Sequence, residues 1–322
     1  MKAPIHFAIP FLAATFLTPL AASTAEPSQQ TWRITNGTLA VAVSQRDAGA
    51  VCSLVYDGQE FVNDHDHGRQ LQVAWFYNDL GEAYNPTEAG ADKDGVGPRS
   101  TSQLVSVQAD GHILQTVNHP AHWRHTSLPE EHRKNTALVS KDTLTKKLTL
   151  GFNGDPHVLV FDTTVAISPE LTGPPMNSIR IEAPTLYSHP HLGRHQLFDL
   201  ASGELKEVPS RALNFDQMNE VIRHVTRHDV APILSSRDGR HAVAFFTPQR
   251  GNFWAYCTHD VPSKDPTNAC GKMTAFFKHA VAAGQSHSYR TFIVVGDLAT
   301  VQASLRKLAT HGTETPPSQG KP

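Results

Sequence analysis

Stretches of strand length, with apolar residues alternating or in short runs, recur along almost the whole of this 322-residue chain. Turn-forming residues separate them, and no segment of helical period lies between them. The stretches that we expect to form strands are 32–35, 39–43, 51–56, 60–62, 70–77, 104–109, 113–117, 147–151, 158–167, 178–183, 220–225, 241–246, 253–256, 273–277 and 286–295. So many strands without intervening helices predict an all-β fold, an antiparallel β-sandwich, and argue against alternating strand–helix units.

One helix is expected after the last strand, and it closes the fold. Asp297 is suited to be its N-cap. The apolar residues that follow recur at helical spacing: Leu298, Val301, Leu305 and Leu308. We therefore expect a single β-sandwich domain over 26–310 and a polar, disordered tail over 311–322.

The N-terminus has the features of an export signal. Lys2 supplies a positive charge, 7–20 is apolar, and the small residues Ser23 and Ala25 suit a cleavage site. Two prolines interrupt the apolar stretch, which argues against a membrane anchor. We expect residues 1–25 to be a signal peptide, and the mature protein to be periplasmic or secreted without a membrane partner.

Charge limits the class of partner. The chain has 28 Lys and Arg against 30 Asp and Glu, so it lacks the basic surface that nucleic-acid binding requires. Histidine, with 19 copies, is abundant, and it is the side chain that titrates near neutral pH. We expect no nucleic-acid partner.

The three cysteines suggest one disulfide, because export permits such bonds. Cys257 and Cys270 flank a segment rich in turn formers, and we expect a bond between them at the base of a long loop. Cys52 lies in an apolar alternating stretch and is expected to be a buried free thiol.

Two polar segments carry candidate binding residues. Residues 64–72 contain His67, Arg69 and Gln70 at the start of a strand, and the loop 84–95 contains Asn85 and Glu88. The first segment lacks a third zinc ligand, and the second lacks the late glutamate of a calcium loop. We expect no metal or other cofactor.

Two histidine-rich segments supply further candidates. The first contains His119, His122 and Trp123, which offer proton transfer and an aromatic face for a sugar ring. The second segment, 187–195, contributes three more candidates for binding: His189, His191 and Arg194. Glu182, at the end of an alternating strand, is a candidate acid.

No nucleophile elbow, P-loop, dinucleotide fingerprint or zinc-protease motif is present, which argues against serine hydrolases, ATPases, NAD enzymes and such proteases. The opening strands over 34–43 and 49–58 resemble the paired first strands of the galactose mutarotase-like β-supersandwich. This fold is shared by aldose epimerases and by domains of glycoside hydrolases and polysaccharide lyases. Gly68-Arg69 is similar to the family's glycine-arginine near the sugar site, and 283–295 resembles its last sheet strand.

The resemblance implies a supersandwich and a carbohydrate ligand, but not sugar epimerisation. Where the family has a glutamate before a Pro-Gln pair, this chain has Thr247, and the second arginine expected soon after Arg69 is missing. We expect an exported carbohydrate-active protein that cleaves a poly- or oligosaccharide as a hydrolase or lyase. The alternative is a carbohydrate-binding protein without turnover.

The roles follow from the chemistry of each reaction. Hydrolysis needs two carboxyl groups, for which Glu88 and Glu182 are the best pair. Elimination beside a uronate needs a cation, for which Arg69 is suited, and a base, for which His119 or His122 is suited. We expect the four segments around 65–70, 78–100, 118–135 and 187–195 to meet on one face.

Overall fold

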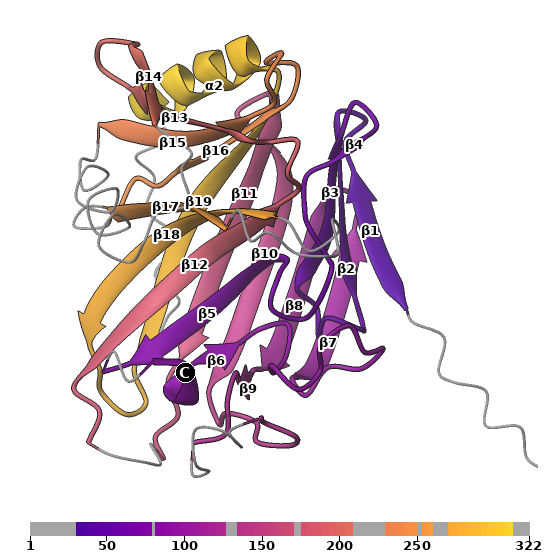
Figure 1. The fold of residues 1–322 in the computed structure, drawn as a ribbon, viewed down its shortest axis with the longest axis vertical. Helices are drawn as coiled ribbons and strands as arrows, with labels where there is room; N and C mark the ends of the chain where they lie inside the picture. The colour runs from indigo at the N-terminus through magenta and orange to yellow at the C-terminus, as the bar shows by residue number, and fades with distance from the viewer. Residues whose placement is uncertain are drawn as a thin grey trace, which may run out of the picture.

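A computed structural model describes residues 30–78, 81–126, 134–170, 175–208, 229–249, 253–259 and 270–311. Over these residues the chain forms two antiparallel sheets and a C-terminal helix, α2 (Leu298–His311) (Figure 1). The all-β sandwich with one terminal helix predicted from the alternation is confirmed. The proposed signal peptide and the tail from 312 onward lie outside the described residues.

The first sheet has ten strands, seven of them in the order β1-β2-β3-β5-β12-β18-β17. The other three are short: β4 pairs with β3, and β6 joins β5 to β9. The strands are β1 (Thr31–Thr35), β2 (Leu39–Ser44), β3 (Val51–Tyr56), β4 (Gln59–Glu60), β5 (Leu71–Tyr77), β6 (Pro86–Thr87), β9 (Ala121–His122), β12 (Ser178–Ser188), β17 (Phe253–His259) and β18 (Cys270–Ala280). A short 3-10 helix, η1 (Gly81–Tyr84), precedes β6.

The second sheet has nine strands in the order β14-β13-β15-β16-β19-β11-β10-β8-β7. They are β7 (Gln103–Asp110), β8 (Ile113–His119), β10 (Thr143–Phe152), β11 (Asp155–Ala166), β13 (Arg194–Asp199), β14 (Leu205–Val208), β15 (Val230–Ser235), β16 (Ala242–Phe246) and β19 (Ser286–Gly296). The last two strands of the chain, β18 and β19, therefore lie inside different sheets.

The main core fills the space between the two sheets, because successive side chains of a strand point to opposite faces. In β5, Leu71, Val73, Trp75 and Tyr77 all point inward and are almost fully buried. Phe161 of β11 and Ile293 of β19 face them from the nine-stranded sheet. The alternation read in the sequence thus identifies the inner residues.

Helix α2 covers the other face of the nine-stranded sheet. Its apolar stripe of Val301, Leu305 and Leu308 packs in a second core with side chains of β11, β16 and β19. The Asp297 carboxylate accepts a hydrogen bond from the Thr300 amide at 2.8 Å, which confirms the expected N-cap. Among the described residues, no helix is long and apolar enough to span a membrane.

Some strand boundaries differ from those expected. Strands β13, β14 and β15 were not predicted, and the segment 220–225 lies outside the described residues. Strand β15 is buried along its whole length but contains Pro232, which is unusual within a sheet and masks the strand pattern.

The outer face of the ten-stranded sheet differs from all of these surfaces. On the central strands β5, β12 and β18, most of the residues that alternate with the core positions are polar, charged or aromatic, and Ala74 is an exception. The polar, charged and aromatic residues are Gln72, Phe76, Arg180, Glu182, Thr185, Tyr187, Lys272, Thr274, Phe276 and Lys278. We refer to this surface as the outer face.

Candidate functional site

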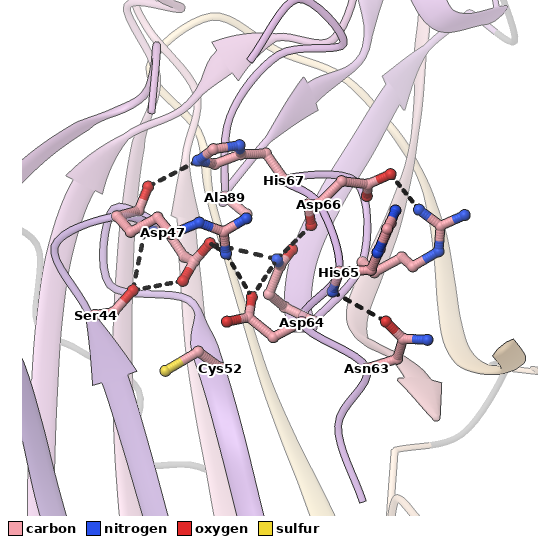
Figure 2. A network of polar contacts seen from close by, with 12 residues as sticks. Ser44, Asp47, Cys52, Asn63, Asp64, His65, Asp66, His67 and Ala89 are labelled. Atoms are coloured by element: carbon pink, nitrogen blue, oxygen red, sulfur yellow. Dashed lines mark hydrogen bonds and ion pairs between the residues drawn. The ribbon is translucent and has the colours of Figure 1, made fainter. Parts of the chain in front are cut away.

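A polar network fixes the segment that leads into β5 (Figure 2). The Arg46 guanidinium contacts Asp47 at 3.0 Å and Asp64 at 2.9 Å, and the Gln70 side-chain amide donates to Asp64 at 2.8 Å. Both ring nitrogens of His67 lie 2.9 Å from backbone carbonyl oxygens. His67 and Gln70 are fully buried, so they shape the segment and do not present groups to a ligand, contrary to the prediction.

The two carboxyl groups that Arg46 contacts both have raised pKa values. Burial and the neighbouring Asp47 raise the pKa of Asp64 to about 7, and burial also raises the pKa of Asp47. Together with Cys52 they form the one group of potential metal ligands within the described residues. However, Arg46 already bridges both carboxylates, and burial raises the pKa of the Cys52 thiol to about 12. We therefore assign no metal to this network.

Arg69 marks the point where this segment reaches the outer face. Its guanidinium forms an ion pair with Asp66 and lies beside the Cys270 thiol of β18. Gly68 packs against the Trp123 ring, since a Cβ at position 68 would lie 2.6 Å from Cη2 of that ring. Glycine at 68 thus allows an aromatic ring to lie beside Arg69.

The centre of the outer face carries a carboxylate, an amine and a phenol in contact. The Lys272 ammonium lies 3.3 Å from the Glu182 carboxylate and 5.2 Å from the centre of the Tyr187 ring. Glu182 is 4% exposed, whereas the Lys272 side chain is 16% exposed and Tyr187 is partly exposed. Lys272 and Tyr187 are opposite each other in the register of β12 and β18, so two adjacent central strands hold the group. This is the candidate site.

Three of the four predicted segments meet close to it. Trp123 donates its amide to the Asn85 carbonyl at 2.7 Å, His122 pairs with Pro86, and the His67 amide donates to the Gly95 carbonyl at 3.1 Å. The fourth segment reaches the group only at its start, where the Tyr187 amide donates to the Gln70 carbonyl at 3.0 Å.

The remainder of the fourth segment lies elsewhere. His191 packs against His189, His241 and Phe61, and burial together with His189 and His241 lowers the pKa of His191 to about 4. Arg194 lies on β13, at the opposite end of the molecule from β9 (Figure 1), and pairs with Glu207 at 2.7 Å. The structure therefore does not support these side chains as ligand-binding residues of the same site.

Glu88 and the first histidine segment are also placed differently from the prediction. Glu88 is fully buried in an ion pair with Lys146, which extends from the opposite sheet, and it accepts a hydrogen bond from the Val73 amide. His119 bonds the Asp142 carbonyl, and burial lowers the pKa of His122 to about 4. Glu88 is a core residue, and neither histidine contacts the group of Glu182, Lys272 and Tyr187 in any described interaction.

Asn85 lies close to the candidate site but contributes mainly through its backbone. Its carbonyl accepts the Trp123 amide, while its side chain is 7% exposed. Its amide oxygen is buried without a hydrogen-bond partner among the described residues. Asn85 thus fixes the position of Trp123.

The predicted disulfide is wrong. Cys270 is a free thiol, as is Cys52, whose free state was expected. In the register of β17 and β18, Cys257 is opposite Lys272, while Cys270 is opposite His259. Such diagonal positions lie roughly 7–8 Å apart, farther than the Cα atoms of a normal disulfide.

The residue of the site that the sequence did not single out is Lys272, while Tyr187 was included only as part of a segment. The available signal was a charged residue at an alternate position of an otherwise apolar strand. That signal also occurs at Lys146, which is a core residue, so it does not identify a site by itself.

No protein-family model matches the chain, and no curated protein sequence matches it. Among solved structures, it is similar to a galactose mutarotase-related enzyme from Lactobacillus acidophilus, with 10% identity over 84% of this chain and 98% of that one, at a TM-score of 0.46. A putative aldose 1-epimerase from Escherichia coli K12 is 12% identical over 84% of this chain and 100% of that one, at 0.45.

A heparan sulfate lyase from Pedobacter heparinus is 8% identical over 84% of this chain and 35% of its own, at a TM-score of 0.42. The first two of these proteins belong to the group that the sequence resemblance named. Because all three TM-scores are below 0.5, we take no argument about activity from these similarities.

Proposed function

We propose that this protein is a carbohydrate-active enzyme that cleaves a poly- or oligosaccharide on the outer face. The observation that supports the proposal is the group of Glu182, Lys272 and Tyr187, held in contact by two adjacent strands, with Arg69 and Trp123 beside it. A sugar ring binds to sites that combine an aromatic face with a few fixed polar groups.

Elimination beside a uronate agrees with these residues better than hydrolysis does. Hydrolysis requires a second carboxyl group across the scissile bond, and Glu88, the predicted partner of Glu182, is held in the core by Lys146. Elimination requires positive charge at the uronate carboxylate and a base for the neighbouring C–H proton. Lys272 and Arg69 supply the charge, and the Glu182 carboxylate is the proposed base that takes the C–H proton. As the C–O bond to the leaving sugar breaks, the Tyr187 phenol is the proposed acid that protonates the departing oxygen.

We also propose that the protein acts in the periplasm or outside the cell, as its N-terminal sequence suggests. The test is to express the full chain and to determine the N-terminal residue of the exported form. Cleavage after Ala25 supports export, whereas an intact Met1 in the cytoplasm contradicts it.

The activity is tested by incubating the purified protein with uronate-containing and neutral polysaccharides. Reducing ends report either reaction, and ultraviolet absorbance of unsaturated products reports elimination alone. We expect both signals together with a uronate polymer, and their loss in Glu182→Gln, which removes the base but retains the size of the side chain. Lys141→Gln, in an exposed ion pair, is the matched control and should retain full activity.

The possible outcomes separate the alternatives. Reducing ends without unsaturated products would indicate hydrolysis and contradict the assigned reaction. Affinity for a polysaccharide without any product would indicate the non-catalytic binding protein, the alternative function. Full turnover by Glu182→Gln would exclude Glu182 as the base.

A further inference from the structure

A second group of ligand-binding character lies farther along the outer face, beyond Glu182. Phe76, Arg180 and Lys278 are neighbours in one row across three adjacent strands, β5, β12 and β18, since Arg180 pairs in register with both other residues. Figure 1 shows these three strands side by side. All three side chains alternate with core residues, so they lie on the outer face.

The Arg180 guanidinium is held in place by two aromatic rings. It lies 4.5 Å from the centre of the Phe76 ring and 5.5 Å from the centre of the Phe276 ring. Arginine stacked on aromatic rings retains its planar donors at the edge of the guanidinium, where they match a carboxylate or a sulfate. Phe76 and Arg180 are partly exposed, and Lys278 is exposed. The row therefore combines an aromatic surface with two cationic groups.

The row lies next to the candidate catalytic group, one step beyond Glu182 on the same face of β12 and β18. Lys278 and Lys272 are six residues apart on the same face of β18, which corresponds to roughly 20 Å along a strand. The Lys272 ammonium, however, reaches Glu182 at 3.3 Å, so the row lies about two residues, or roughly 7 Å along the strand, from the catalytic group. The Phe276 ring and Glu182 lie between the two lysines, directly opposite each other in the register.

We propose that Phe76, Arg180 and Lys278 form a subsite beside the catalytic group that binds the negatively charged group of a neighbouring unit in an acidic oligosaccharide. The inference rests on the proposed function, and it specifies the substrate as a polyanionic chain that lies along β12 and β18. A carboxylate or sulfate at one end of the bound segment contacts Arg180 and Lys278. The scissile unit lies at Glu182, Lys272 and Arg69.

The test compares binding of acidic and neutral glycans by titration calorimetry. The probes are polygalacturonate, alginate and heparan sulfate, with dextran and methyl-esterified polygalacturonate as neutral controls, each at several salt concentrations. For whichever acidic polymer the parent protein binds, we expect Arg180→Gln/Lys278→Gln to lower the affinity by about tenfold or more. The double variant should also reduce the dependence of that affinity on salt concentration. Lys141→Gln/Lys307→Gln removes two exposed charges elsewhere and should change neither quantity.

Lys278→Gln alone is the second variant, because Lys278 is exposed and its loss does not disturb the stacked arginine. This single variant should also lower the affinity for the acidic polymer, and its circular dichroism spectrum should be unchanged.

Equal affinity of the parent and both variants for an acidic polymer that is cleaved would overturn the proposed subsite and leave the proposed function intact. Tighter binding of the neutral polymers would overturn the acidic substrate class. Failure of every glycan to bind or react would instead overturn the proposed function and the subsite together.

Discussion

The contribution of the buried ion pair between Glu88 and Lys146 to the free energy of unfolding can be predicted and measured, because this pair connects the two sheets. Both side chains are fully buried. Glu88 also accepts the Val73 amide at 2.9 Å, and Lys146 also donates to the Gly49 carbonyl at 2.7 Å. Lys146→Met removes the ammonium but retains an apolar chain of similar length, and thus leaves a buried carboxylate without its cation.

The expected loss follows from these contacts. Removing one partner of a buried ion pair costs about 3–5 kcal/mol, and the lost hydrogen bond to Gly49 adds roughly 1 kcal/mol. We therefore expect a decrease of about 4–6 kcal/mol in the free energy of unfolding, which is a large part of the roughly 5–15 kcal/mol typical of a folded protein.

Urea unfolding followed by tryptophan fluorescence measures this decrease. Glu88→Gln/Lys146→Met restores a neutral pair that still accepts the Val73 amide, and it should recover most of the loss. Lys141→Met breaks the exposed pair with Glu170 and should cost less than about 1 kcal/mol. A loss below about 1 kcal/mol for Lys146→Met, or a double variant no more stable than the single one, would refute the reasoning.

Three further predictions concern pH, packing and thiols. Burial lowers the pKa of four histidines to about 4, so the folded state favours their neutral form. These histidines are His122, His191, His195 and His287. The stabilisation from these neutral histidines is complete above their unfolded pKa of about 6.5 and is lost as the pH falls toward 4. The raised carboxyl pKa values of the polar network partly offset this loss. The free energy of unfolding, measured by urea titration, should therefore decrease as the pH is lowered, and it should decrease less steeply in His287→Gln. Gly68→Ala should displace the Trp123 ring, cost about 1–3 kcal/mol and weaken glycan binding in calorimetry, and unchanged binding would contradict the contact. The denatured protein should react with a thiol reagent at three cysteines, and a count of one would reinstate the bond between Cys257 and Cys270.

The alternation of apolar residues was sufficient to predict the sandwich, because burial of one strand face leaves a local signature in the sequence. Leu71, Val73 and Trp75 show it in three alternate positions. The terminal helix was equally accessible, since its cap and its stripe are also local. Strand β15 was not predicted, because a proline within a fully buried strand removes the pattern on which the prediction relied.

The candidate site could be predicted only in part, because it depends on pairings between distant segments. Glu182 was a candidate acid because it ends an alternating strand, and the structure places it on the outer face. Its contact with Lys272 spans 90 residues and requires the register of β12 and β18. Glu88 had an equally polar local sequence, but its partner Lys146 is 58 residues away in a different sheet. One sequence does not reveal which carboxylate acquires a core partner.

The order of the nine-stranded sheet has a consequence for synthesis of the chain. Strand β19 is the link between the group β14-β13-β15-β16 and the group β11-β10-β8-β7, and it comes from the last strand segment of the chain. A ribosome-bound chain that ends before Ser286 therefore holds two partial sheets with open edges, which are able to pair with other chains. Because such distant pairings form late, the sandwich closes only after nearly the whole chain has emerged. Until then the open strand edges remain accessible to a chaperone.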